Sequence, residues 1–199
     1  MTDMAAPPSM GVLMVTRWVD YSNKYGIGYQ LSNGNVGVYF NDATKMIISQ
    51  DETVVAYAEK DLVEKFKAAN IPKILAKKFY LVQHFKSYMA QNCRSEGLES
   101  ALSSIPVLDN TVNLYVTKFM RNEHAVSFLL SNGAVQCNFF DHSKIRISED
   151  AVTVAAYNGH CNLSRWTLNP TLLLEKENTW LREKIQNAVD SMDSWSRKP

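Results

Sequence analysis

Several features that mark other protein classes are scarce in this sequence. Its three cysteines, Cys93, Cys137 and Cys161, are widely spaced and form no CxxC pair. That spacing argues against a disulfide framework or a zinc site and favours a reducing, intracellular compartment. No stretch approaches the roughly 18 apolar residues that a membrane span requires. Residues 1–13 lack a basic region followed by an apolar core, so we expect a flexible tail there and not a signal peptide.

Charge of one sign is not in excess, and the common enzyme motifs are absent. Lys and Arg total 21 against 20 Asp and Glu, a net charge of +1. This balance gives no basis for generic nucleic-acid binding, so any bound anion must be recognised by a few placed residues. The sequence has no glycine-rich nucleotide loop, no HRD or DFG string, no GxSxG and no HExxH. We therefore expect a non-catalytic chain with no cofactor and no metal.

What the sequence does contain is an internal duplication. Residues 31–49, LSNGNVGVYFNDATKMIIS, align without a gap with residues 130–148, LSNGAVQCNFFDHSKIRIS. After one inserted residue the match resumes, with TVVAY at 53–57 facing TVAAY at 153–157. Chance does not produce such a run, so the chain holds two copies of one structural unit.

Each unit is predicted to be an antiparallel meander followed by a helix. Asn33-Gly34 and Asn132-Gly133 indicate hairpin turns of type I′. Short β-rich runs surround them, at 28–31, 36–40, 46–49 and 53–58 in the first unit and at 125–130, 135–140, 145–148 and 152–157 in the second. Helical spacing of apolar residues then follows in both units. The helix-face residues are Leu75, Phe79, Val82, Phe85 and Met89, and later Leu174, Leu181, Ile185, Ala188, Met192 and Trp195, with Asn169-Pro170 as a plausible start of the second helix.

One sheet with one helix does not close a core, so we expect the two units to pack together. A groove between them would be a natural ligand site. The expected division is a tail at 1–13, the first unit at 14–94, a polar linker at 95–110, the second unit at 111–195 and a tail at 196–199.

Three segments carry a resemblance to a known family. WVDYSNKYGIGYQL at 18–31 resembles the start of the first polo box of polo-like kinases, LSNG through DHSK at 130–144 resembles the second polo box, and FKSYM at 85–89 resembles the helix closing the first box. The resemblance runs from about Val15 to Met192. It implies an α+β fold of two six-stranded antiparallel sheets, each with a helix, packed as a twelve-stranded β-sandwich. It also implies the non-catalytic C-terminal region of a polo-like serine/threonine kinase.

The resemblance further implies a function. Family members bind phosphoserine or phosphothreonine peptides between the boxes, commonly with serine before the phosphorylated residue, and so target the kinase to docking proteins. By this resemblance the phosphate-binding pair is His142 and Lys144, and the expected peptide-binding residues are Trp18, Val19, Asp20, Cys93, Arg121, Asn138 and Phe140. Cys93 takes the place of a family leucine, and the turn before His142 is one residue shorter than in vertebrate members.

The resemblance also suggests partners and places. Docking of the kinase domain on this module could restrain the kinase. The expected locations are the cytoplasm and nucleus, at the centrosome, spindle pole, basal body, kinetochore or division site, with roles in mitosis and cytokinesis. We expect a monomer that binds phosphopeptides and neither nucleic acid nor membrane. The alternative is a polo-box module that dimerises or acts as a scaffold without needing phosphate.

A comparison of the two copies supports the phosphate pair without the family. The first unit has Asp42-Ala43-Thr44-Lys45 where the second has Asp141-His142-Ser143-Lys144, so only the second unit has the histidine. If this segment is extended, residues two apart point the same way and can converge on one anion. A histidine in such a pair would make binding depend on pH. The other interpretation of His142 and Lys144 is a surface loop whose side chains are solvated. For Trp18 the other interpretation is a tryptophan of the core or of a sheet edge.

Overall fold

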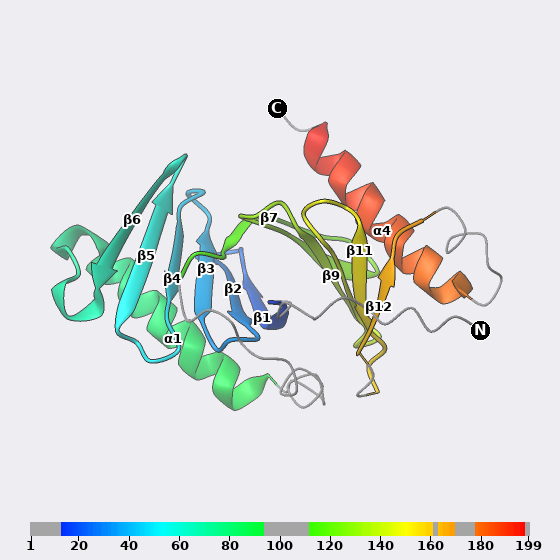
Figure 1. Cartoon of the computed structure of the whole chain (residues 1–199). Coiled ribbons are helices and arrows are strands. Elements are labelled where there is room, and N and C mark those ends of the chain that lie inside the picture. Colours follow the sequence, from blue (N-terminus) through cyan, green and yellow to red (C-terminus); the bar gives the residue numbers. More distant parts are fainter. Residues whose placement is uncertain (1–12, 94–111, 161–162, 170–177, 198–199) are drawn as a thin grey trace.

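The computed structural model describes residues 13–93, 112–160, 163–169 and 178–197 (Figure 1). These residues form two six-stranded sheets, and in both sheets every strand pairs antiparallel with its neighbour in sequence, which confirms the predicted fold. The first unit comprises β1 (Val15–Tyr21), β2 (Gly26–Leu31), β3 (Val36–Phe40), β4 (Lys45–Ile48), β5 (Val54–Glu59), β6 (Leu62–Lys67), the short 3-10 turns η1 (Ala68–Asn70) and η2 (Lys73–Leu75), and α1 (Ala76–Asn92). The second comprises β7 (Val116–Arg121), β8 (Ala125–Leu130), β9 (Val135–Phe139), β10 (Lys144–Ile147), β11 (Thr153–Tyr157), β12 (Leu163–Thr167) and α4 (Thr179–Ser196).

Three buried clusters define the layers of the molecule. One cluster lies between the first sheet and α1, and another lies between the second sheet and α4. The third joins the sheets, with Ile27 and Tyr29 of the first unit packed among Val126 and Phe128 of the second. The order is therefore helix, sheet, sheet, helix, and each sheet is covered on both faces (Figure 1). This arrangement closes the core that one unit alone would leave open.

The two Asn-Gly hairpin turns are of one kind, and it is not the predicted type I′. Gly34 has φ of 82° and Gly133 has φ of 90°, whereas neither preceding asparagine has a positive φ. The amide of Gly34 donates to the carbonyl of Leu31 over 2.9 Å, as in a type I turn that ends in a left-handed residue. The left-handed position recurs every nine residues in each unit, at Gly34, Ala43 and Glu52 and again at Gly133, His142 and Ala151.

The two helices bury the faces that their spacing predicts, with one exception. In α1 the buried residues are Val82, Phe85 and Met89. In α4 Ser191 faces the core and Met192 is 40% exposed, so the placement of Met192 in the apolar stripe was wrong. Leu174 and Pro170, like Cys161 and the expected linker, lie outside the described residues. Within the described part of the chain, no helix has the length and apolarity to cross a membrane.

Reciprocal hydrogen bonds join the two units. A register shift interrupts the pairing of β1 after Val15 and that of β7 after Val116, and such irregularities leave backbone groups without a ladder partner. The amide of Val15 donates to the Gln136 side chain over 2.8 Å, and that side chain donates back to the Val15 carbonyl over 2.8 Å. The amide of Val116 donates to the hydroxyl of Tyr29 over 2.9 Å. Each unit therefore provides hydrogen-bond partners for backbone groups in the irregular first strand of the other.

Candidate functional site

Aromatic and charged side chains from both units meet where β1 passes the end of β9. The ring of Trp18 lies 6.4 Å from the ring of Phe140, at an interplanar angle of 52°. The Arg121 guanidinium lies 5.4 Å from the centre of the Phe140 ring and bridges to the Asp20 carboxylate over 3.7 Å. The Cys93 thiol lies 3.8 Å from the carbonyl of Trp18. We call these five residues the seam cluster, because they line the junction between the units.

Two of the expected peptide-binding residues are not part of this surface. Asn138 is 2% exposed, and its amide donates to the carbonyl of Val15 over 3.2 Å and accepts from Gln136 over 2.6 Å. The prediction of a peptide contact for the Asn138 side chain was therefore wrong, because this side chain belongs to the packed junction. Val19 is half-buried and packs against the α1 side of the first sheet, on the opposite face of β1 from Trp18.

Of the expected phosphate pair, His142 lies in the turn between β9 and β10, which starts at Phe140, and Lys144 is the first residue of β10. His142 is exposed and has φ of 68°, in the left-handed region, so the segment is not extended at His142 and the condition for convergence by simple alternation is not met. The Lys144 ammonium lies 3.5 Å from the His142 carbonyl and 5.6 Å from the centre of the Tyr157 ring. The Lys144 ammonium thus lies beside the turn that carries the imidazole. Side-chain alternation did not predict this contact with the backbone of the turn.

The carboxylate of Asp141 organises this turn. One carboxylate oxygen accepts from the amide and hydroxyl of Ser143, over 3.0 and 2.5 Å. The other accepts from the Lys184 ammonium of α4 over 2.6 Å. The first unit repeats the arrangement with Asp42, Thr44 and Lys78. The sequence comparison missed the two lysines, because they lie outside the segments that align.

These bonds also set the acidity of both carboxylates. Burial raises the pKa of Asp141, but hydrogen bonds from Lys184 and Ser143 outweigh it and leave the pKa below the ordinary value. The balance at Asp42 is the same, with burial opposed by Lys78 and Thr44. A carboxylate with a lowered pKa in the folded state stabilises the protein above its unfolded pKa, and the contribution is lost as the pH falls through the lowered value.

A pH series on Asp141→Asn would check this balance. We expect the variant to melt below the wild-type protein at neutral pH, because asparagine cannot pair with the Lys184 ammonium. The difference should shrink as the pH falls below about 4, the ordinary pKa of an aspartate, and should be lost once the pH has fallen through the lowered pKa of Asp141. The measurement is thermal unfolding followed by circular dichroism. A difference that stays constant over the whole pH range would contradict this account.

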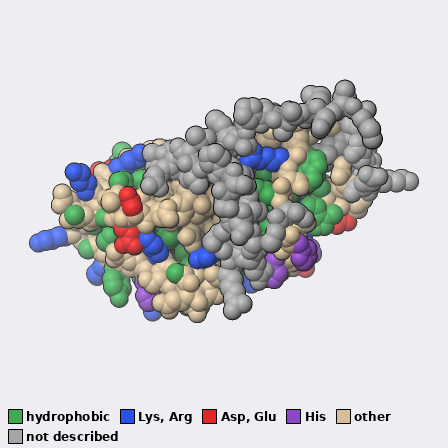
Figure 2. Space-filling model, turned by 60° about the horizontal axis from the view of Figure 1, so that its bottom comes forward, with side chains coloured by type: hydrophobic (Ala, Val, Ile, Leu, Met, Phe, Trp, Pro, Cys, Tyr) green, Lys and Arg blue, Asp and Glu red, His purple; other side chains and the backbone are tan. Residues whose placement is uncertain are grey.

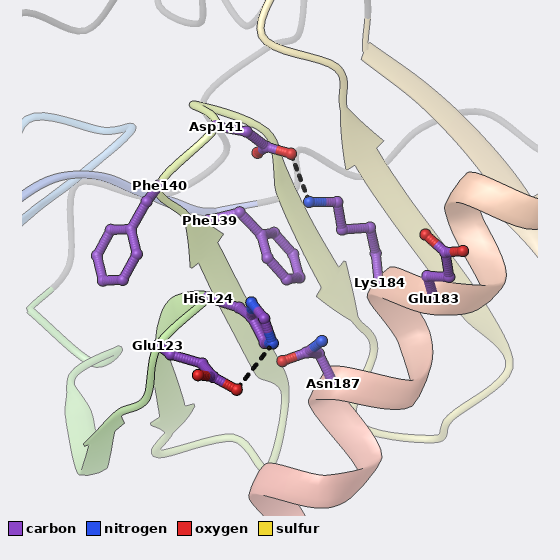
Figure 3. Close-up of a pocket in the computed structure, with 8 residues that line it drawn as sticks. All are labelled: Glu123, His124, Phe139, Phe140, Asp141, Glu183, Lys184 and Asn187. Carbon is purple, nitrogen blue, oxygen red and sulfur yellow. Dashed lines mark hydrogen bonds and ion pairs between the residues drawn. The ribbon is translucent and has the colours of Figure 1, made fainter.

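Two hollows flank the site. One, of about 460 Å³, lies between the turn and α4 and is lined by Glu123, His124, Phe139, Phe140, Asp141, Glu183, Lys184 and Asn187 (Figure 3). The other, of about 470 Å³, lies next to Arg121 and is lined by Tyr39, Lys118, Phe119, Met120, Arg121, Ser194 and Trp195. On the face drawn in Figure 2, Lys and Arg side chains are scattered and form no single block. Among the described residues, this face therefore shows no broad basic patch, in agreement with the net charge of +1.

Comparisons with known proteins agree with this architecture. A family model described as the POLO box duplicated region matches residues 23–79 and 122–185. A probable serine/threonine-protein kinase CCRP1 from Zea mays is 39% identical over 145 residues, covering 68% of this chain and 22% of the relative. Serine/threonine-protein kinase PLK1 from Xenopus laevis is 35% identical over 147 residues, 70% of this chain and 23% of the relative. The chain thus spans about a quarter of the length of these kinases.

Solved structures show the same fold. The budding yeast Cdc5 polo-box domain in complex with an Spc72 phosphopeptide superposes with a TM-score of 0.79 and 27% identity, over 96% of this chain and 72% of that one. The same domain in complex with the Dbf4 polo-interacting region gives a TM-score of 0.76 and 25% identity, over 98% of this chain and 77% of that one. With its duplicated sheets and its family match in both units, this chain belongs to the polo-box family and corresponds to the non-catalytic polo-box region of polo-like serine/threonine kinases.

Proposed function

We propose that this chain binds phosphoserine or phosphothreonine peptides at the junction of its two units and so targets a polo-like kinase to phosphorylated docking proteins. One observation carries the proposal. An exposed histidine, His142, occupies the left-handed turn position of the second unit, two residues after Phe140 of the seam cluster, where the first unit has Ala43. A duplicated fold needs the same core twice, whereas a single ligand site needs a change in only one copy.

The chemistry of the turn suits a phosphate. A phosphomonoester carries about −1.5 to −2 charges near neutral pH and has three acceptor oxygens. The imidazole of His142 and the ammonium of Lys144 can both donate charge-assisted hydrogen bonds to such a group. His142 and Lys144 are two residues apart, so both donors lie on one short segment of chain, and the Lys144 ammonium lies 3.5 Å from the His142 carbonyl. Little further ordering is then needed when the anion binds.

The seam cluster suits the peptide that carries the phosphate. Trp18 and Phe140 provide two adjoining aromatic rings, and Phe140 is 41% exposed. Such rings can pack against an extended peptide at low entropic cost. The bridged pair of Asp20 and Arg121 adds a polar rim beside them. We propose that the residue before the phosphosite, a serine by family resemblance, lies against Trp18.

Partners and location follow from the relatives and form part of the proposal. The Cdc5 polo-box domain binds an Spc72 phosphopeptide and the Dbf4 polo-interacting region. For this chain we propose phosphorylated docking proteins at microtubule-organising structures such as spindle poles or basal bodies. Docking of a kinase domain on this module, with restraint of its activity, is a further hypothesis that the same surface could serve.

A titration with matched peptides tests the proposal. A fluorescent peptide with a Ser-phosphoThr core should bind with a Kd of about 1 μM or tighter, which corresponds to about 8 kcal/mol. Its unphosphorylated twin should bind at least about a hundredfold more weakly, because the charged donors lose their acceptor. Fluorescence polarisation measures both, and a peptide with glutamate in place of phosphothreonine separates phosphate geometry from simple charge.

The rival function has a distinct signature in the same experiment. A module that dimerises without phosphate would bind the three peptides equally or not at all, and would self-associate in analytical ultracentrifugation. Equal affinity for the phosphorylated and unphosphorylated peptides would therefore reject the phosphopeptide proposal, and self-association in the same sample would favour the rival.

A further inference from the structure

Lys184 connects helix α4 to the turn that carries His142. Its side chain is 14% exposed, and its ammonium lies 2.6 Å from the Asp141 carboxylate and 3.8 Å from the centre of the Phe139 ring. Figure 3 shows Phe139 and Phe140 pointing apart, with Lys184 reaching from α4 to Asp141. The hollow of about 460 Å³ separates the rest of the helix from the turn here. Of the two interactions drawn in that view, only this ion pair joins α4 to the turn.

The helix is a firm anchor for this contact. Leu181, Ile185 and Ala188 of α4 are buried in the core of the second unit, so the backbone on both sides of Lys184 is fixed by packing. The turn, by contrast, contains a strained residue, since a residue other than glycine in the left-handed region costs of the order of 1 kcal/mol or more. His142 directly follows Asp141 and occupies that conformation with φ of 68°. An ion pair that fixes the Asp141 carboxylate therefore also restrains the backbone that enters His142.

The first unit contains the same device without the imidazole. Lys78 of α1 pairs with Asp42 over 2.6 Å, its side chain is 22% exposed, and Ala43 follows with φ of 63°. The ion pair is therefore an inherited support for a hairpin turn. Only in the second unit does that turn carry a histidine, so only there can the support influence a ligand.

We propose that Lys184 is a positioning residue for phosphate binding, which acts by fixing Asp141 and through it the turn that presents His142 and Lys144. This inference rests on the proposed function and names a residue of α4 that makes no contact with the phosphate itself. Without Lys184 the turn would sample more conformations, and the anion would have to order it on binding, which lowers affinity.

The duplication supplies a matched pair of variants. Lys184→Met should weaken binding of the Ser-phosphoThr peptide by about tenfold, the lower end of what loss of an outer supporting partner costs a bound ion. Lys78→Met removes the same kind of ion pair from the first unit and should leave affinity within about twofold of wild type. Both variants should lower the melting temperature by similar amounts. Equal affinities for the two variants would overturn the proposal.

Two further variants separate positioning from charge. Lys184→Met leaves the Asp141 carboxylate without its lysine partner near a dianion, and repulsion alone could weaken binding. Adding Asp141→Asn removes that charge and keeps an oxygen for Ser143. If Lys184 positions the turn, the double variant stays weak, and Lys184→Arg restores affinity to within about threefold by re-forming a charged pair. Recovery of wild-type affinity in the double variant would show that charge was the cause and would reject positioning.

Failure of this inference can be told apart from failure of the proposed function. If the wild-type chain does not distinguish phosphorylated from unphosphorylated peptide, the proposed function itself falls. If the wild-type chain does distinguish them and Lys184→Met binds as Lys78→Met does, only the positioning role is rejected.

Discussion

Replacing His142 by alanine and Lys144 by methionine together is expected to abolish measurable binding of a Ser-phosphoThr peptide. Loss of a charged donor to a bound anion costs about 2 kcal/mol or more, so loss of both should weaken binding by about a thousandfold. Fluorescence polarisation with the matched peptides measures the change. The double variant should bind the phosphorylated peptide no better than its unphosphorylated twin.

The two replacements are chosen so that the fold is preserved. The first unit already has an alanine, Ala43, at the same turn position with φ of 63°, so His142→Ala adds no backbone strain. Methionine retains the apolar stem that in Lys144 packs towards the Tyr157 ring. Surface substitutions of this kind change stability by about 0.5 kcal/mol or less, so the melting temperature should move by less than about 2 °C.

A control from the first unit sharpens the result. Lys45 is the counterpart of Lys144, and its ammonium lies 5.5 Å from the centre of the Tyr39 ring. Lys45→Met should leave peptide affinity unchanged if the site belongs to the second unit. An equal loss in Lys45→Met, or unfolding of the His142→Ala/Lys144→Met variant, would mean that the pair in the second unit is not a phosphate site.

Gln136→Leu is expected to have the largest effect on stability. Gln136 is fully buried, and its side chain bonds both the amide and the carbonyl of Val15 across the junction. Leucine has a similar size but leaves the Val15 amide without an acceptor and removes the donor to Asn138. A buried polar group without a partner costs about 1–3 kcal/mol, so we expect a loss of about 2–4 kcal/mol.

Urea unfolding measures this change. The midpoint should fall while the slope against urea stays constant, because the surface exposed on unfolding does not change. The loss is a large share of the stability of an ordinary domain, about 5–15 kcal/mol. Gln91→Leu, at an exposed position near the end of α1, is the control and should be nearly neutral. If Gln136→Leu were as neutral as the control, the hydrogen bonds across the junction would contribute little.

The same variant should also affect the ligand site. Trp18 follows Val15 by three residues on β1, so loosening the start of this strand should move the indole relative to Phe140. Weaker binding of the phosphorylated peptide should therefore accompany the lost stability, although Gln136 itself is buried away from the site.

Much of the fold could be predicted from residues that repeat locally. The aligned segments at 31–49 and 130–148 predicted two units, and the spacing of Val82, Phe85 and Met89 predicted the buried face of α1. The turn type could not be predicted as well. An Asn-Gly pair is compatible both with a type I′ turn and with a type I turn that ends in a left-handed glycine, and the structure has the second.

Polar residues of β9 show where alternation misleads. Gln136 and Asn138 alternate with apolar neighbours, as on a strand with one solvent-exposed face, and the family resemblance placed Asn138 at the peptide surface. In the structure every residue of β9 is buried, because α4 covers one face of the sheet and the first unit covers the other. Alternation reports which residues share a face but does not report what covers that face.

By itself, the sequence determined the duplication, the strand and helix periods, and the presence of a histidine in only one copy of a repeated turn. Tertiary structure alone decided which polar side chains cross the junction, that Trp18 meets Phe140, and that Lys184 supports the turn of His142. The physical reason is range. Periodicity and turn preference act between residues a few positions apart, whereas these contacts join residues 43 to 122 positions apart, which only the packing of the whole chain brings together.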